Sequence, residues 1–161
     1  MTTPFFLQFG IRLLVTMHLV HISTTTVWGQ IVTWSQVEGL PEGGAGPIKG
    51  YQDGTLLLAT RNGIFHSTDN GIYWRASITD IPILSHETVL RGFARTSQGN
   101  LFASEMTEGI LKSTDGGNNW HTVLDLATQF PSGEASQIHV GTDDTLFALI
   151  TAYGLIRSAD E

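Results

Sequence analysis

An eight-residue motif that returns at a fixed spacing constrains this chain more than any other feature. It occupies residues 67–74 (Ser-Thr-Asp-Asn-Gly-Ile-Tyr-Trp) and residues 113–120 (Ser-Thr-Asp-Gly-Gly-Asn-Asn-Trp), and it begins again at residues 158–161. The period is about 45 residues, a length typical of repeat proteins. The sequence therefore predicts an array of similar structural units.

The segments around each motif have the pattern of short β-strands. Hydrophobic residues make up 41% of the chain and charged residues only 14%, and 18 residues are glycine, which is typical of a folded domain with many turns. We expect an all-β fold whose units are four antiparallel strands, with repeats over about residues 48–77, 89–124 and 136–161. The third repeat lacks its last strand.

The composition of the motif explains why it would close a turn. Serine and aspartate side chains can bond the backbone amides of a tight turn, glycine supplies a positive φ, and tryptophan offers a large surface to bury. The residues in these positions are Ser67, Asp69, Gly71, Trp74, Ser113, Asp115, Gly117, Trp120, Ser158 and Asp160. We interpret them as structural, since one active site does not need a copy in every repeat.

The pattern Ser-x-Asp-x-Gly-x-x-Trp resembles the Asp-box, or bacterial neuraminidase repeat, of sialidase-like β-propellers. The resemblance covers residues 30–161 and implies propeller blades of four antiparallel strands with Asp-box turns on the rim away from the binding face. It favours photosystem II assembly factor-like and sortilin-type repeat proteins over true sialidases, because Asp80 stands where the arginine of their Arg-Ile-Pro motif belongs. A ring takes about four to eight blades, so about three blades imply an incomplete ring and a fragment.

The N-terminal segment differs from the repeats. Arg12 is the only charged residue among residues 1–29, and an apolar run of about ten residues follows it. We interpret residues 1–29 as a signal peptide cleaved near Gly29, which predicts a secreted, periplasmic or cell-surface protein. An uncleaved anchor and a misassigned start remain the alternatives. The run is shorter than the roughly 20 residues that span a bilayer, so we do not expect a membrane-spanning chain.

Residues 31–38 alternate like a strand and contain Trp34, which aligns with Trp74 and Trp120. We interpret this segment as an orphan outer strand, whose partner strands come from elsewhere in the chain. The mature domain is then residues 30–161, a partial Asp-box β-propeller.

Charge and residue usage argue against several classes of function. The formal net charge is −7 and no run of Lys or Arg occurs, so we expect no nucleic-acid partner. The chain has no cysteine, which removes disulfides and thiol chemistry. His66, His121 and His139 lack the spacing of metal ligands, and we expect neither a metal nor a cofactor.

Arg91 and Arg95 are the candidate ligand-binding residues. They flank Phe93 on a strand predicted to be innermost, and they would point to the same side if that strand is regular. Two arginines facing a central cavity could hold a carboxylate or a glycan acid.

The remaining carboxylates have two interpretations. Glu105 and Glu108 could form an acid/base pair, although a solvated hairpin is the simpler explanation. Asp143 and Asp144 lie where the other repeats have turns, which indicates turn chemistry. We identify no catalytic residue.

These observations favour an exported, non-catalytic β-propeller that acts as a protein- or glycan-binding or assembly module. The alternative is a glycoside hydrolase, sialidase-like or xyloglucanase-like, whose catalytic residues lie in blades absent from this chain. A sensor or adhesin domain is a third hypothesis. If the chain is truly this short, its open faces predict self-association.

Overall fold

The computed structural model describes residues 24–27, 30–41, 45–79 and 89–158. It divides into two units, Met1–Glu38 and Gly39–Glu161, and each is described by itself. Residues 1–23 and 28–29, most of the predicted signal peptide, lie outside the described residues, and so does Asp160 of the third motif.

The first unit contains an antiparallel hairpin. β1 (Thr24–Val27) pairs with β2 (Gln30–Thr33). We expected a strand over residues 31–38, but β2 ends at Thr33, and Trp34 is 67% exposed. Within the described residues β2 pairs with β1 alone, so its role as an outer strand stays a prediction.

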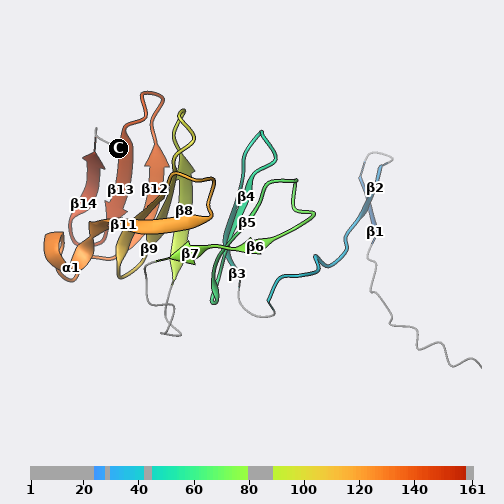
Figure 1. Cartoon of the computed structure of the whole chain (residues 1–161), viewed down its shortest axis with the longest axis horizontal. Helices are drawn as coiled ribbons and strands as arrows, with labels where there is room; N and C mark the ends of the chain where they lie inside the picture. The colour runs from blue at the N-terminus through green and yellow to red at the C-terminus, as the bar shows by residue number, and fades with distance from the viewer. Residues whose placement is uncertain (1–23, 28–29, 42–44, 80–88, 159–161) are drawn as a thin grey trace, which may run out of the picture. The chain divides into compact units, whose positions relative to one another are not determined.

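The second unit contains three antiparallel sheets whose first strands are neighbours, because β8 contacts β3 as well as β12 (Figure 1). Sheet 1 runs β3 (Ala45–Gly50), β4 (Leu56–Thr60), β5 (Gly63–Ser67), β6 (Arg75–Ala76). Sheet 2 runs β8 (Leu90–Arg95), β9 (Leu101–Glu105), β10 (Gly109–Ser113), β11 (Asn119–Asp125). Sheet 3 runs β12 (Ala135–Val140), β13 (Leu146–Ile150), β14 (Gly154–Ser158).

Two short elements were not anticipated from the sequence. β7 (Ile78–Thr79) leaves sheet 1 and pairs in parallel with the outer strand β11 of sheet 2. α1 (Leu126–Gln129) links β11 to β12, and the side chain of Asp125 caps it by accepting a 2.9 Å hydrogen bond from the Ala127 amide. Among the helices of the described part, none is long and apolar enough to cross a membrane.

The three sheets share one hairpin register. The first residue of each second strand lies opposite the serine of its motif, in the pairs Leu56–Ser67, Leu101–Ser113 and Leu146–Ser158. The turns between the second and third strands contain Gly63, Gly109 and Gly154, all with positive φ, which glycine adopts readily. At Gly109 a Cβ atom would also lie 1.9 Å from the Leu124 carbonyl oxygen, which leaves room for glycine alone.

Two apolar layers hold the sheets together. We call the layer between sheets 1 and 2 the first interface; its buried residues are Leu57, Ala59, Ile64, Leu90, Phe93, Leu101, Ala103, Leu111 and Trp120. We call the layer between sheets 2 and 3 the second interface; its buried residues are Ala94, Phe102, Ile110, Leu126, Ala135, Ile138, Ala148 and Ile150. Alternate residues of β9 thus face opposite interfaces, as the period of a strand requires.

Trp120 is the largest side chain of the first interface. It is 3% exposed, its ring centroid lies 6.2 Å from that of Phe93, and its Nε1 donates a 3.0 Å hydrogen bond to the Gly117 carbonyl. The outer strand of sheet 2 therefore supplies a tryptophan that fills the contact with sheet 1.

Candidate functional site

The two complete copies of the repeated motif form similar turns. In the first, Ser67 Oγ donates to Asp69 Oδ1 at 2.7 Å and accepts from the Gly71 amide at 2.9 Å. Asp69 Oδ1 also accepts from the amides of Ile72 and Tyr73 at 3.1 and 3.0 Å. These hydrogen bonds, that from Tyr73 first, lower the pKa of Asp69. This carboxylate is therefore engaged by the backbone of its own turn.

Three of these four bonds recur in the second copy. Ser113 Oγ donates to Asp115 Oδ1 at 2.9 Å and accepts from the Gly117 amide at 3.0 Å. Asp115 Oδ1 accepts from the Asn119 amide at 2.9 Å. Gly71 and Gly117 have φ of 86° and 95°, so both turns need a residue that tolerates positive φ. Of the third copy, only Ser158 lies in the described part.

The two candidate arginines lie on different sides of β8. Arg91 and Arg95 would face one side of a regular strand, but the register shifts between Leu90 and Gly92 and makes Arg91 an extra residue. Arg95 reaches sheet 1, whereas Arg91 borders a hollow on the side of sheet 3. The structure therefore does not bring the two guanidinium groups together.

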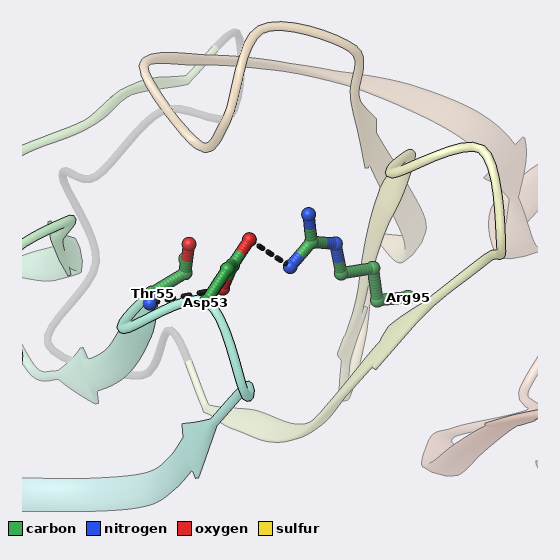
Figure 2. A network of polar contacts seen from close by, with 3 residues as sticks. All are labelled: Asp53, Thr55 and Arg95. Atoms are coloured by element: carbon green, nitrogen blue, oxygen red, sulfur yellow. Dashed lines mark hydrogen bonds and ion pairs between the residues drawn. The ribbon is translucent and has the colours of Figure 1, made fainter.

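Arg95 has a partner within the protein. Its Nη1 lies 2.7 Å from Asp53 Oδ2, and the other carboxylate oxygen of Asp53 accepts from the Thr55 amide at 3.1 Å (Figure 2). The hydrogen bond from Arg95 is the main reason why the pKa of Asp53 falls to about 2. The guanidinium carbon also lies 5.2 Å from the ring centroid of Tyr51, whose pKa burial raises to about 12. Arg95 is thus engaged in joining sheets 1 and 2.

Arg91 is exposed on its bulge and has no ion-pair partner among the described residues. Its Nη2 lies 3.1 Å from Met106 Sδ. It borders a hollow of about 370 Å³ that lies over β12, β13 and β14. The other lining residues are Gly92, Gln137, Ile138, His139, Phe147, Leu149 and Leu155. An arginine therefore stands beside an open apolar surface that carries no carboxylate.

The bulge on β8 has counterparts on the other two innermost strands. The register also shifts between Ala45 and Ile48 of β3 and between Ala135 and Gln137 of β12. The three shifts fall at corresponding positions of the repeat. The bulge is therefore a repeated feature of the innermost strands. Bulges re-aim side chains and are frequent near functional sites. The sequence pattern alone gave no signal for them.

Glu105 differs from both sequence-based hypotheses. It is fully buried, so it is not part of a solvated hairpin. Its Oε1 accepts from the Val89 amide at 2.9 Å, and its Oε2 accepts from the amides of Thr107 and Glu108 at 2.7 and 2.6 Å. A carboxylate that binds three amides orders the turn and the entry to β8, and it is not placed to exchange protons with a substrate.

The predicted turn role of Asp143 and Asp144 is confirmed. Asp143 Oδ1 accepts from the Thr145 amide at 3.2 Å, and Asp144 has a φ of 65°. Asp144 also accepts from the amide of Ser97 at 2.7 Å and from its hydroxyl. This contact joins the turns of sheets 2 and 3, as Asp53 and Arg95 join sheets 1 and 2.

A buried polar chain crosses the first interface. Ser77 Oγ donates to the Gly117 carbonyl at 2.5 Å and lies 3.2 Å from His66 Nδ1. Because the hydroxyl proton is used on Gly117, His66 Nδ1 is the donor of the second bond. Burial first, and then the charge of Arg75, lower the pKa of His66. His66 is therefore a structural histidine, and within the described residues no His, Asp and Glu side chains group into a metal site.

Comparisons with known proteins bear on the fold. No protein-family model matches the chain, and no curated protein does. A structure of YCF48 bound to D1 peptide matches 85% of this chain with a TM-score of 0.51 and 21% identity, and YCF48 from Cyanidioschyzon merolae matches 87% with 0.52 and 17%. The GH74 enzyme of Niastella koreensis matches 76% with 0.54 and 16% identity.

These similarities define the class of fold. The chain has a propeller-like all-β fold, similar to parts of YCF48 and of the GH74 enzyme. It spans 42% and 48% of the two YCF48 chains and 20% of the GH74 enzyme. At identities this low the resemblance concerns the fold alone.

Proposed function

We propose that the three sheets are blades of an Asp-box β-propeller, part of an incomplete ring, and that the protein is an exported, non-catalytic binding module. Its ligand is an acidic segment of a protein partner or the acid group of a glycan, and Arg91 is its anchor. The two motif turns, with their matching serine and aspartate bonds, support the assignment as Asp-boxes. The similarity to a structure of YCF48 bound to D1 peptide favours a protein segment.

The observation that carries this proposal is the placement of Arg91. A bulge projects it beside a hollow lined by Gln137, His139 and apolar side chains, while no described carboxylate pairs with it. An arginine with free donors binds a carboxylate through short, charge-assisted hydrogen bonds. The apolar residues Phe147 and Leu149 can bury the side chains that flank such a group.

The engagement of the carboxylates supports a module without catalysis. A glycosidase needs two carboxyl groups that face its substrate. In the described part of the chain, Glu105 is buried in a turn, Asp69 and Asp115 bind backbone amides, and Asp53 pairs with Arg95. No observation on these residues favours the hydrolase.

Binding of labelled peptides tests the proposal. Short apolar peptides that carry Asp or Glu should bind, and their Asn or Gln counterparts should bind at least about tenfold more weakly, because a hydrogen bond to a charged group contributes about 1.5–3 kcal/mol. Arg91→Ala should remove this preference. Fluorescence anisotropy measures both effects.

The matched control is Arg61→Ala, since Arg61 is exposed on the turn between β4 and β5. It should leave binding unchanged. If both variants lost peptide affinity equally, the loss would reflect the net charge of the protein. That outcome would contradict a binding site at Arg91. Export is tested separately, since the intact mass of the exported chain reports whether processing occurs near Gly29.

A further inference from the structure

Met106 lies directly beside the arginine that we propose as the anchor of the binding site. The Nη2 of Arg91 donates to Met106 Sδ at 3.1 Å. Arg91 is exposed and Met106 is partly exposed, so the pair lies at the surface of the protein. A thioether sulfur is only a weak hydrogen-bond acceptor. A carboxylate that binds Arg91 can therefore replace this contact at little cost.

The main chain of Met106 is held in place from both sides. Its amide donates to the Val89 carbonyl at 3.0 Å, and its carbonyl accepts from the Ala135 amide at 3.0 Å. These two partners lie at the entries to β8 and β12, the innermost strands of sheets 2 and 3. The buried carboxylate of the preceding residue, Glu105, also binds the Val89 amide. Met106 therefore cannot move away from Arg91 without the loss of several backbone hydrogen bonds.

Sheet 3 has neither residue of this pair at the corresponding positions. The bulge residue of β12 is Ser136 where β8 has Arg91, and Thr151 follows β13 as Met106 follows β9. The amide of Thr151 donates to the Glu134 carbonyl at 3.0 Å, just as the amide of Met106 bonds the residue before β8. The repeat therefore forms this backbone contact without methionine, and the fold does not require a thioether at position 106.

We propose that Met106 is an oxidation site through which a peroxide weakens ligand binding at Arg91, given the function proposed above for this arginine. Hydrogen peroxide transfers one oxygen atom to Sδ: the O–O bond breaks, an S=O bond forms, and water leaves. The sulfur is oxidised and the peroxide is reduced. The product is methionine sulfoxide, which methionine sulfoxide reductases convert back to the thioether.

Oxidation changes the group that Arg91 faces. The new oxygen is added at the atom that the guanidinium already contacts, and it makes an apolar side chain polar. A hydrogen bond from a cationic donor is short and strong. The sulfoxide would thus engage Nη2, one of the donors that a ligand carboxylate needs. Acidic peptides should bind about three- to tenfold more weakly, as expected for competition by one hydrogen bond.

Treatment of the folded, full-length protein with hydrogen peroxide tests the site of modification. After catalase has removed the peroxide, mass spectrometry of proteolytic peptides should locate an added oxygen on Met106. The other methionines are Met1 and Met17, and the matched control Met106→Leu keeps both. If Met106 stayed unmodified under conditions that fully oxidise a free methionine peptide, it would not be an oxidation site.

Fluorescence anisotropy with a labelled acidic peptide that lacks methionine measures the effect on binding. The affinity of the oxidised parent should fall about three- to tenfold, and the two methionine sulfoxide reductases together should restore it. The affinity of Met106→Leu should be the same before and after peroxide. Met106→Gln, whose amide oxygen resembles that of the sulfoxide, should bind weakly without oxidation. Equal losses in the oxidised parent and in oxidised Met106→Leu would overturn the proposal.

The chemical reactivity of Arg91 provides a readout that needs no ligand. Phenylglyoxal modifies guanidinium groups, and mass spectrometry reports the rate for each arginine. Oxidation of Met106 should slow the reaction at Arg91 and leave Arg61, which is exposed on another turn, unchanged. If oxidation merely disrupted the structure, the reaction at Arg91 would not slow down. An unchanged or faster rate would therefore contradict a bond between the sulfoxide and Arg91.

The two readouts also separate this regulation from the binding function on which it rests. Failure of acidic peptides to bind the unoxidised parent would refute the binding function. Normal binding that full oxidation of Met106 leaves unchanged would refute only the regulation.

Discussion

The two interfaces of the second unit use the same register but are filled differently. In the first interface Trp120, which comes from the outer strand of sheet 2, is almost fully buried against residues of sheets 1 and 2. The equivalent place in the second interface is a hollow of about 490 Å³. Trp120 shows that the outer strand of a sheet contributes to the contact with the preceding sheet as well as to its own sheet.

The polar contacts are also more deeply buried in the first interface than in the second. The first interface is crossed by the buried chain from His66 through Ser77 to Gly117 and by the parallel pairing of β7 with β11. The second is crossed at the turns by Ser97 and Asp144, which are bonded at a more exposed site. We therefore expect the first interface to be the more stable of the two.

The largest expected effect is the loss of the tryptophan that fills the first interface. Trp120→Ala should reduce the free energy of unfolding by about 3–5 kcal/mol, since it leaves a large cavity. Trp74→Ala should cost clearly less, because Trp74 is only half-buried. Urea denaturation followed by circular dichroism measures both variants. Equal losses would contradict the special role of the filled interface.

A matched pair of alanine substitutions compares the two interfaces directly. Ala103→Leu enters a packed layer and should destabilise the protein by about 1–3 kcal/mol. Ala148→Leu at the equivalent position enters the hollow and should be neutral or stabilise by about 0.5–2 kcal/mol.

Both alanine variants are made in the parent protein. Their free energies of unfolding are obtained from urea titrations. Destabilisation of similar size at both positions would mean that the second interface is as tightly packed as the first.

The smallest expected effect is a pH dependence confined to the first interface. The pKa of His66 is lowered on folding. As the pH falls, His66 therefore becomes protonated in the unfolded chain before it does so in the folded protein. The contribution of neutral His66 to the free energy of unfolding should be fully present above the pKa of about 6.5 in the unfolded chain. It should be lost as the pH falls through the lower pKa of the folded protein. The melting temperature of the parent should thus fall more steeply between pH 7 and pH 5 than that of His66→Gln.

The control for this measurement is His121→Gln, since His121 is exposed on β11. It should keep the pH dependence of the parent protein. If removal of His121 changed the slope as much as removal of His66, the buried chain would not be its source.

The local features of the repeats were predictable from the sequence, and the contacts between repeats were not. The positive φ of Gly71 and Gly117 and the turn role of Asp143 follow from residue preferences within a few positions, and the structure confirms both. Whether the described sheets belong to a ring of Asp-box blades stays a proposal.

The features that the sequence did not predict depend on distant neighbours. Arg91 is re-aimed by a bulge, which no alternation pattern encodes, and Arg95 is engaged by Asp53 from another sheet. The buried carboxylate of Glu105 accepts a hydrogen bond from the Val89 amide, and the pairing of β9 with β8 brings these two residues together. In each case contacts with residues distant in the sequence decide the surroundings of the side chain.

The pairing of β7 with β11 has a mechanical consequence. It ties the exit of sheet 1 to the outer rim of sheet 2, while sheet 3 is connected to sheet 2 through the one-turn helix α1. Under tension between the ends of the second unit, sheet 3 should peel away first, and sheets 1 and 2 should yield later as one body. The molecule would then lengthen in two unequal steps.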